Sequence, residues 1–226
     1  FGAIVNHGRD RLFDPTRKTA IHPSHEALGA VFEDVGQWKR PWYYPKVGEG
    51  MHAAVDRECR TVRETAGLFD ASTLGKIEVV GPDAAQFLDL LYTNSWQKLA
   101  PGRCKYGIML REDGFIYDDG VVGRIADDRF HVTTTTGGAP RVLHHMEDYL
   151  QTEFPHLKVW LTSTTDEWSV IAVQGPKARE IVEPFVEGIE ISADAMPHMS
   201  VREGRSAVRQ LGCSASPSPA NSPSRS

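Results

Sequence analysis

The chain has few cysteines, no long apolar run and no excess of basic charge. Its three cysteines, Cys59, Cys104 and Cys213, lie far apart in 226 residues. An odd and scattered set supports neither a disulfide framework nor a Cys-x-x-Cys metal site, so we expect a reducing, cytoplasmic location. No apolar run approaches the length of a membrane span, which predicts a protein without a membrane anchor. The first residue is Phe1 rather than Met, which suggests processing or a piece of a longer protein.

The charged and polar residues exclude several further classes of site. The formal net charge is -5, so a cationic face for nucleic acid is not expected. The pairs His22/His25 and His144/His145 lack the additional ligands that a zinc site needs, and no metal is predicted. Neither G-x-G-x-x-G after a strand, nor G-x-x-x-x-G-K-[ST], nor G-x-S-x-G occurs. The chain therefore carries no recognisable nucleotide-binding unit or hydrolase nucleophile.

The length and the 40% hydrophobic content suit one domain with appendages. Residues 1–50 are rich in turn formers and aromatics, show no sustained period, and are expected to form an ordered connector. Their aromatics could line a ligand channel, but aromatics near prolines more often anchor a strap to a domain surface; they are Trp38, Trp42, Tyr43 and Tyr44. Residues 51–67 predict an amphipathic helix with Cys59 as a small buried hydrophobe.

The most informative stretch runs from Tyr106 to Gly138. It predicts a hairpin closed at Asp113-Gly114, a further strand over residues 129–136, and a helix that begins after Gly137-Gly138. Asp118 and Asp119 then lie inside a strand, where a carboxylate must face solvent, a partner or a ligand. An edge strand with solvated acids is one interpretation. A polar small-molecule site beside the glycine-opened helix is the other.

Two strand-to-helix junctions resemble each other, one at Gly81-Pro82 and one at Gly175-Pro176. Proline suits the first helical turn, so a helix is expected to begin near each proline. The similarity is either the coincidence of a common junction or the trace of a duplicated core. Strands outnumber helices in either case, which predicts an α+β fold.

The spacing Tyr-x-x-x-Leu-x-x-x-Gly-x-Ile-x-Asp-Asp from Tyr106 to Asp119 resembles the folate-binding domain of the glycine cleavage aminomethyltransferase, or T-protein. The segments RKTAIHPSHEALGAVFEDVGQWKRPWYYP, CRTVRETAGLFDASTLGKIEVVGPDAAQFL and RFHVTTTTGGAPRVL are similar to the carboxyl-terminal region of the alpha subunits of heterotetrameric sarcosine oxidases. This resemblance covers Arg11 to about Arg205. It implies an aminomethyltransferase-like fold, truncated, with a mixed or antiparallel sheet and packed helices.

The resemblance also implies a division of labour. A flavin site elsewhere in the complex oxidises sarcosine, and tetrahydrofolate on this domain captures the one-carbon unit as 5,10-methylene-tetrahydrofolate. FAD, FMN and NAD are expected elsewhere, and the implied partners are the beta, gamma and delta subunits. An aminomethyltransferase or dimethylglycine dehydrogenase relative, and a folate-binding-like module without turnover, stay open as alternatives.

Candidate residues follow from the same resemblance. Tyr106 would pack against the pterin ring, and Asp118 or Asp119 would stabilise the cationic iminium and help to remove a proton. The resemblance does not choose between the two carboxylates. Thr134 and Thr135 stand where the aminomethyltransferase has an asparagine, so they are candidates for binding the folate.

The expected domains are 1–50, a connector from an upstream dehydrogenase region, 51–205, an incomplete folate-binding domain, and 206–226, an aberrant Ser/Pro-rich tail. Back-translating the tail and reading it one nucleotide earlier yields VCGAPTRLFRVSFTGELAFEV. This string restores a strand pattern and the family's Thr-Gly-Glu, which predicts a frameshift near Arg205; a genuine alternative terminus is the other interpretation. DNA sequencing across Arg205 decides between them. The chain as written is expected to be inactive alone.

Overall fold

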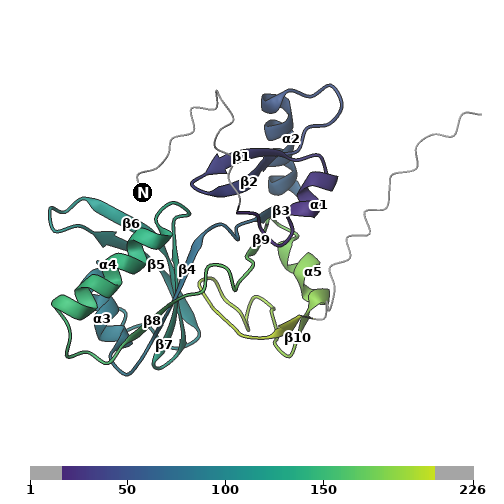
Figure 1. Cartoon of the computed structure of the whole chain (residues 1–226). Coiled ribbons are helices and arrows are strands. Elements are labelled where there is room, and N and C mark those ends of the chain that lie inside the picture. Colours follow the sequence, from purple (N-terminus) through teal and green to yellow (C-terminus); the bar gives the residue numbers. More distant parts are fainter. Residues whose placement is uncertain (1–16, 207–226) are drawn as a thin grey trace, which may run out of the picture.

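The computed structural model describes residues 17–206, so the tail at 207–226, Cys213 included, lies outside the described residues. The helices are α1 His22–Ala27, α2 Met51–Glu64, α3 Ala84–Leu91, α4 Ala139–Thr152, α5 Ala178–Val182 and the 3-10 helix η1 Glu183–Phe185. The strands are β1 Val31–Val35, β2 Trp38–Tyr43, β3 Gly67–Asp70, β4 Gly75–Val80, β5 Arg103–Leu110, β6 Ile116–Ala126, β7 Arg129–Thr134, β8 Trp160–Ser163, β9 Ile171–Gln174, β10 Val186–Glu187 and β11 Arg205–Ser206 (Figure 1). No helix within residues 17–206 is both long and apolar enough to cross a membrane.

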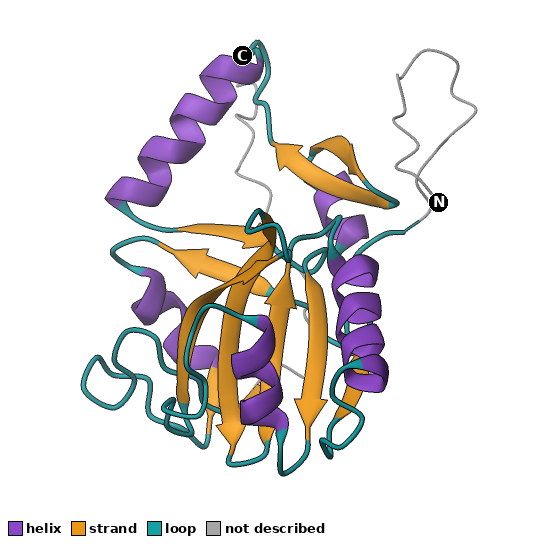
Figure 2. Ribbon diagram, turned by 90° about the vertical axis from the view of Figure 1, so that its left-hand side faces the viewer, coloured by secondary structure: helices purple, strands orange, loops and turns teal. Residues whose placement is uncertain are grey.

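A five-stranded sheet in the order β5-β6-β7-β4-β8 forms the centre of the fold, and every pairing in it is antiparallel. Helices α3 and α4 cover one face of this sheet (Figures 1 and 2). Their side chains join those of the strands in one buried cluster, which includes Phe87 from α3, Met146 from α4 and Phe130 from β7. The predicted α+β class is confirmed, and the sheet is antiparallel throughout.

The hairpin predicted at Asp113-Gly114 is present between β5 and β6. Gly114 has a φ of 84°, a left-handed conformation that glycine adopts without steric cost. The Asp113 carboxylate accepts a hydrogen bond from the Phe115 amide at 3.1 Å, and the Arg111 amide donates to the Phe115 carbonyl at 2.8 Å. The turn is therefore stabilised by residues that are close in sequence, as the Asp-Gly pair predicts.

Both Gly-Pro junctions lead from a strand into a helix, as predicted. Gly81 follows β4 with a φ of 139°, and Gly175 follows β9 with a φ of 120°. A Cβ atom at Gly81 would lie 2.2 Å from the Lys158 carbonyl oxygen, and one at Gly175 would lie 2.5 Å from that of Val62. Glycine is required at both places. The strands belong to different sheets, however, because β9 pairs with β3 in a separate two-stranded sheet.

The segment before α2 contains more regular structure than its sequence suggested. Strands β1 and β2 form an antiparallel hairpin after α1, and Trp38 of β2 is buried whereas Trp42 is exposed. Whether this segment also connects to an upstream region stays a prediction. The prediction for Cys59 was wrong, since its side chain is exposed on α2. Only Ala54 of that helix is fully buried, because little of the described chain packs over it.

Candidate functional site

The two neighbouring carboxylates of β6 lie on opposite faces of the sheet. Successive strand residues alternate between faces, and the register pairs Asp118 with Met109 and Asp119 with Ile108. Met109 is fully buried in the core under the helices, so Asp118 lies on the covered face. Asp119 lies on the face that α3 and α4 leave open. The predicted pair is therefore two separate groups in two separate environments.

Asp118 is buried, and the turn before α4 supplies two hydrogen-bond donors to its carboxylate. The Thr135 amide donates to it at 3.2 Å and the Thr135 hydroxyl at 2.7 Å. A Cβ atom at Gly138 would lie 2.8 Å from the carboxylate, so Gly138 permits this close approach. A buried carboxylate with two such donors stabilises the turn that begins α4. This arrangement suits a structural role.

Asp119 accepts a hydrogen bond from the Tyr106 hydroxyl on the open face. This bond is the main cause that raises the pKa of Tyr106 above its ordinary value. The Tyr106 side chain is 53% exposed, and Val121, its partner in the register, is exposed beside it. An aromatic ring, an aliphatic side chain and a carboxylate thus share one accessible patch.

Of the two predicted threonines, Thr135 bonds to Asp118, and Thr134 is buried next to it in the chain. Thr134 is buried against Gly75. A Cβ atom added to Gly75 would lie 2.0 Å from the Thr134 hydroxyl oxygen. Thr135 is exposed, but its polar groups donate to Asp118. The five predicted residues therefore divide into an open pair, Tyr106 and Asp119, a hydrogen-bonded pair, Asp118 and Thr135, and the buried Thr134.

Two further residues support the open pair, and sequence reasoning missed both. The Asn94 side-chain amide donates to the Tyr106 carbonyl oxygen at 3.1 Å. The Thr133 hydroxyl bridges the Val121 amide and carbonyl at 2.8 and 3.0 Å. Thr133 could have been found, because it begins the predicted threonine run. Asn94 follows α3 in an irregular segment and has no distinguishing pattern.

One cavity of the described chain lies away from the five predicted site residues. A cavity of about 570 Å³ lies between β2, α2 and β3, bordered by residues that include Trp42, Tyr44, Leu68, Phe69 and Asp70. Two of the predicted connector aromatics thus line a cavity. Within the described part of the chain, no group of three His, Cys, Asp or Glu residues is placed to hold a metal ion.

Comparison with known proteins gives relatives of two kinds. The sarcosine oxidase alpha subunit of Corynebacterium sp. (strain U-96) is 51% identical over 203 residues, which are 90% of this chain and 21% of that subunit. The corresponding subunit of Rhizobium meliloti (strain 1021) is 45% identical over 204 residues, with the same shares of the two chains. The aminomethyltransferase of Corynebacterium aurimucosum is 37% identical over 186 residues, 82% of this chain and 47% of that enzyme.

The fold is also similar to a solved structure. The aminomethyltransferase T of the Bartonella henselae glycine cleavage system matches with a TM-score of 0.66 and 27% identity, over 74% of this chain and 43% of that one. The chain thus spans about a fifth of the sarcosine oxidase alpha subunits and about half of the aminomethyltransferases. The family model described as the GCVT N-terminal domain matches residues 21–216. The chain belongs to the GCVT N-terminal domain family.

Proposed function

We propose that this chain is the folate-binding part of a sarcosine oxidase alpha subunit, and that it receives the one-carbon unit released when sarcosine is demethylated to glycine. The similarity to two sarcosine oxidase alpha subunits at 45 to 51% identity supports the substrate class. The observation that carries the site is the Tyr106 to Asp119 hydrogen bond on the open face of the sheet. We assign the chemistry to Asp119 rather than to Asp118.

The residues of the open face fit a folate. The exposed ring of Tyr106 offers a flat surface on which a pterin ring can stack, and Val121 extends it with an apolar side chain. Asp119 provides a carboxylate that can accept hydrogen bonds from ring N–H groups. Asn94 holds the Tyr106 main chain, so the stacking surface has a fixed position.

Tetrahydrofolate, when bound, supplies the nitrogen nucleophiles that accept the one-carbon unit as 5,10-methylene-tetrahydrofolate. Asp119 would stabilise positive charge beside those nitrogens and accept the proton that is released. Tyr106 orients the Asp119 carboxylate by donating its hydroxyl hydrogen to it. FAD, FMN and NAD sites, the beta, gamma and delta subunits and a cytoplasmic location are proposed for the whole enzyme. The upstream connector at 1–50 and the frameshift near Arg205 also stay proposals.

Substitution of the two carboxylates in the complete complex tests this assignment. Asp119→Asn should abolish formation of methylene-tetrahydrofolate while sarcosine oxidation, measured as hydrogen peroxide or formaldehyde release, continues. Asp118→Asn is the matched control and should lower stability more than it changes the product. If Asp119→Asn leaves the folate product unchanged, the acceptor assignment is wrong and a folate-binding-like module without turnover becomes the better interpretation.

A further inference from the structure

Buried polar residues are concentrated in a seam between the amino-terminal segment and the five-stranded sheet. Burying a polar group costs stability unless it is hydrogen-bonded, so such a concentration needs a reason. We call the following residues the polar seam; all are buried: His25, Asp70, Ser72, Thr73, Lys76, Thr134 and Thr136. They come from α1, from β3, β4 and the connection between them, and from the end of β7 and the turn that follows it. The seam therefore joins parts of the chain that are distant in sequence.

The first part of the seam is a chain of hydrogen bonds through His25. Its Nε2 atom lies 3.0 Å from the Asp70 carboxylate, and its Nδ1 atom lies 2.7 Å from the Tyr44 hydroxyl. An ionised carboxylate only accepts hydrogen bonds, so the tautomer that satisfies both contacts has its proton on Nε2. Nδ1 then accepts the hydroxyl hydrogen of Tyr44. The His25 and Asp70 side chains are 5% and 0% exposed, so water competes little for these bonds.

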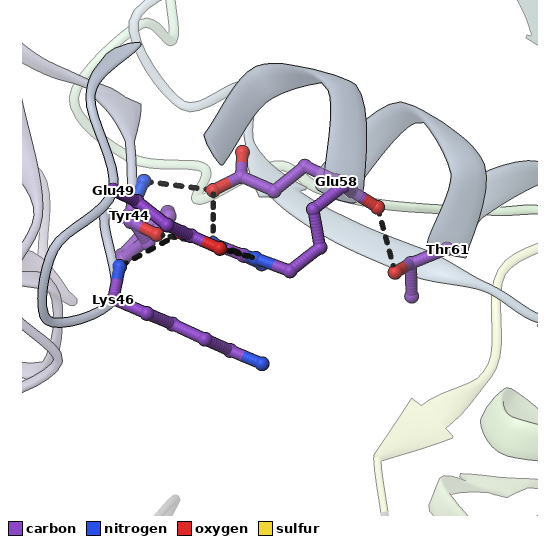
Figure 3. A network of polar contacts seen from close by, with 6 residues as sticks. Tyr44, Lys46, Glu49, Glu58 and Thr61 are labelled. Carbon is purple, nitrogen blue, oxygen red and sulfur yellow. Dashed lines mark hydrogen bonds and ion pairs between the residues drawn. The ribbon is translucent and has the colours of Figure 1, made fainter. Parts of the chain in front are cut away.

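Tyr44 is also fixed by its main chain. Its amide donates to Glu58 at 2.8 Å, and Arg57 of α2 donates to its carbonyl oxygen at 2.7 Å (Figure 3). The Arg57 guanidinium in turn donates to the Glu49 carboxylate, from Nε at 2.9 Å and from Nη2 at 2.8 Å. The side-chain hydroxyl of Tyr44 thus reaches His25 from a main chain that α2 holds at two points.

The seam continues from Asp70 toward the candidate site. The Ser72 amide donates to Asp70 at 3.0 Å, and the Lys76 ammonium donates to the carbonyl oxygens of Ser72 and Leu74 at 2.7 and 3.0 Å. Between these anchors, the Thr73 hydroxyl lies 3.1 Å from that of Thr136. Thr136 follows Thr135, whose amide and hydroxyl hold Asp118. A continuous path therefore runs from Tyr44 to the strand that carries Asp118 and Asp119.

We propose that Tyr44, His25 and Asp70 are positioning residues, which fix the β3–β4 connection and, through Thr73 and Thr136, the turn that holds strand β6 at the candidate folate site. The amino-terminal segment then helps to position the candidate site and is not only a connector. The link to folate rests on the proposed function. The mechanical link from Tyr44 to Thr135 does not, and it is tested separately.

Amide hydrogen exchange in the chain itself tests the mechanical link, with the amides of Ser72 and Thr135 as reporters. Tyr44→Phe removes only the hydroxyl, and we expect both amides to exchange about tenfold faster, since one buried hydrogen bond is lost. Tyr43→Phe is the matched control, because the same atom is removed from the neighbouring tyrosine, and both rates should stay unchanged. If Thr135 keeps its rate in Tyr44→Phe, the proposal is overturned.

A second variant tests the same path independently and covers the case in which Tyr44→Phe does not fold. Thr73→Val breaks the path after Ser72, so it should accelerate exchange at Thr135 about tenfold and leave Ser72 within twofold. Equal rates at Thr135 in Thr73→Val and in the unchanged chain overturn the proposal. Faster exchange at Thr135 alone indicates a path, because a general loss of stability would speed up amide exchange at both Ser72 and Thr135.

In the complete complex, tetrahydrofolate affinity should fall about fivefold in Tyr44→Phe, while the KM for sarcosine measured without folate is unchanged. A general structural defect would change both the tetrahydrofolate affinity and the KM for sarcosine. Faster exchange at Thr135 with unaltered folate affinity would overturn the positioning role at the site. If the unsubstituted complex does not bind folate, the proposed function fails, and the exchange rates still decide whether the polar seam fixes the turn.

Discussion

Asp118 receives two hydrogen bonds in the core, whereas Asp119 meets the Tyr106 hydroxyl at the surface. We predict that Asp118→Asn lowers the free energy of unfolding by about 1 to 3 kcal/mol, because the new NH₂ group faces donors and one of them is left unpaired. Asp119→Asn should change it by less than about 0.5 kcal/mol. Urea denaturation of both variants measures the difference. Equal losses in the two variants would contradict the assignment of the carboxylates to different faces.

Tyr44 makes a second prediction at the residue scale. Burial, with help from Glu58 and Asp70, raises the pKa of its hydroxyl from 10.0 to about 12. Folding therefore favours the protonated phenol, so this contribution to stability is complete below pH 10 and is lost as the pH rises toward 12. The difference between the phenolate absorbance titrations of the unchanged chain and of Tyr44→Phe should have its midpoint near pH 12. A midpoint near pH 10 would show that the hydroxyl is not buried against His25.

At the residue scale, the sequence predicts only part of the candidate site. The strand through Asp118 and Asp119 could be predicted, but the face of each carboxylate could not. The apolar alternation that usually identifies the buried face is weak here, since Tyr117 and Gly120 flank the pair. The partner that distinguishes Asp118, Thr135, is distant in sequence. Only the pairing of β6 with its neighbours orients the two side chains.

At the scale of elements, the junction between β4 and α3 depends on Gly81. Gly81→Ala should lower the free energy of unfolding by about 2 to 4 kcal/mol, because its φ of 139° and the 2.2 Å approach to the Lys158 carbonyl oxygen both oppose a side chain. Gly137→Ala is the control, since nothing lies within 4 Å of a Cβ atom there. Thermal or urea unfolding checks the pair. A loss at Gly81 no larger than at Gly137 would contradict the turn geometry.

Elements with strong local signals were predicted well. The Asp-Gly hairpin, the helix after Gly137-Gly138 and both Gly-Pro junctions depend on residues close in sequence. The hairpin of β1 and β2 was not predicted, because Pro41 interrupts β2 and the apolar residues do not alternate. The buried side of α2 was also misjudged at Cys59, since burial depends on what packs over a helix.

At the scale of the whole molecule, the two-stranded sheet of β3 and β9 leaves apolar side chains uncovered. Leu68 and Phe69 are 58% and 52% exposed. Such a patch should bind a hydrophobic dye such as ANS, and Leu68→Lys should reduce that binding by about half without a loss of stability above about 0.5 kcal/mol. Leu90→Lys, at an exposed leucine of α3, is the control and should leave dye binding unchanged. Unaltered fluorescence in Leu68→Lys would show that the patch lies elsewhere.

The extent of the chain also bears on ligand binding. It spans about half of the aminomethyltransferases that it matches, and Tyr106 on the open face is 53% exposed. We predict weak or absent binding of tetrahydrofolate to the isolated chain, because an uncovered site excludes little water. Isothermal titration measures it. Micromolar affinity would contradict this expectation and would show that the described face suffices.

The pairing of β3 with β9 has a consequence for the order in which the chain acquires its shape during synthesis. The whole five-stranded sheet lies between these two strands in sequence, so it can close on its own helices while β3 still lacks a partner. Asp70 ends β3 and also holds His25. Strand β3 is thus synthesised before the central sheet but paired after it, so its apolar side chains stay unprotected in the newly made chain until β9 has emerged.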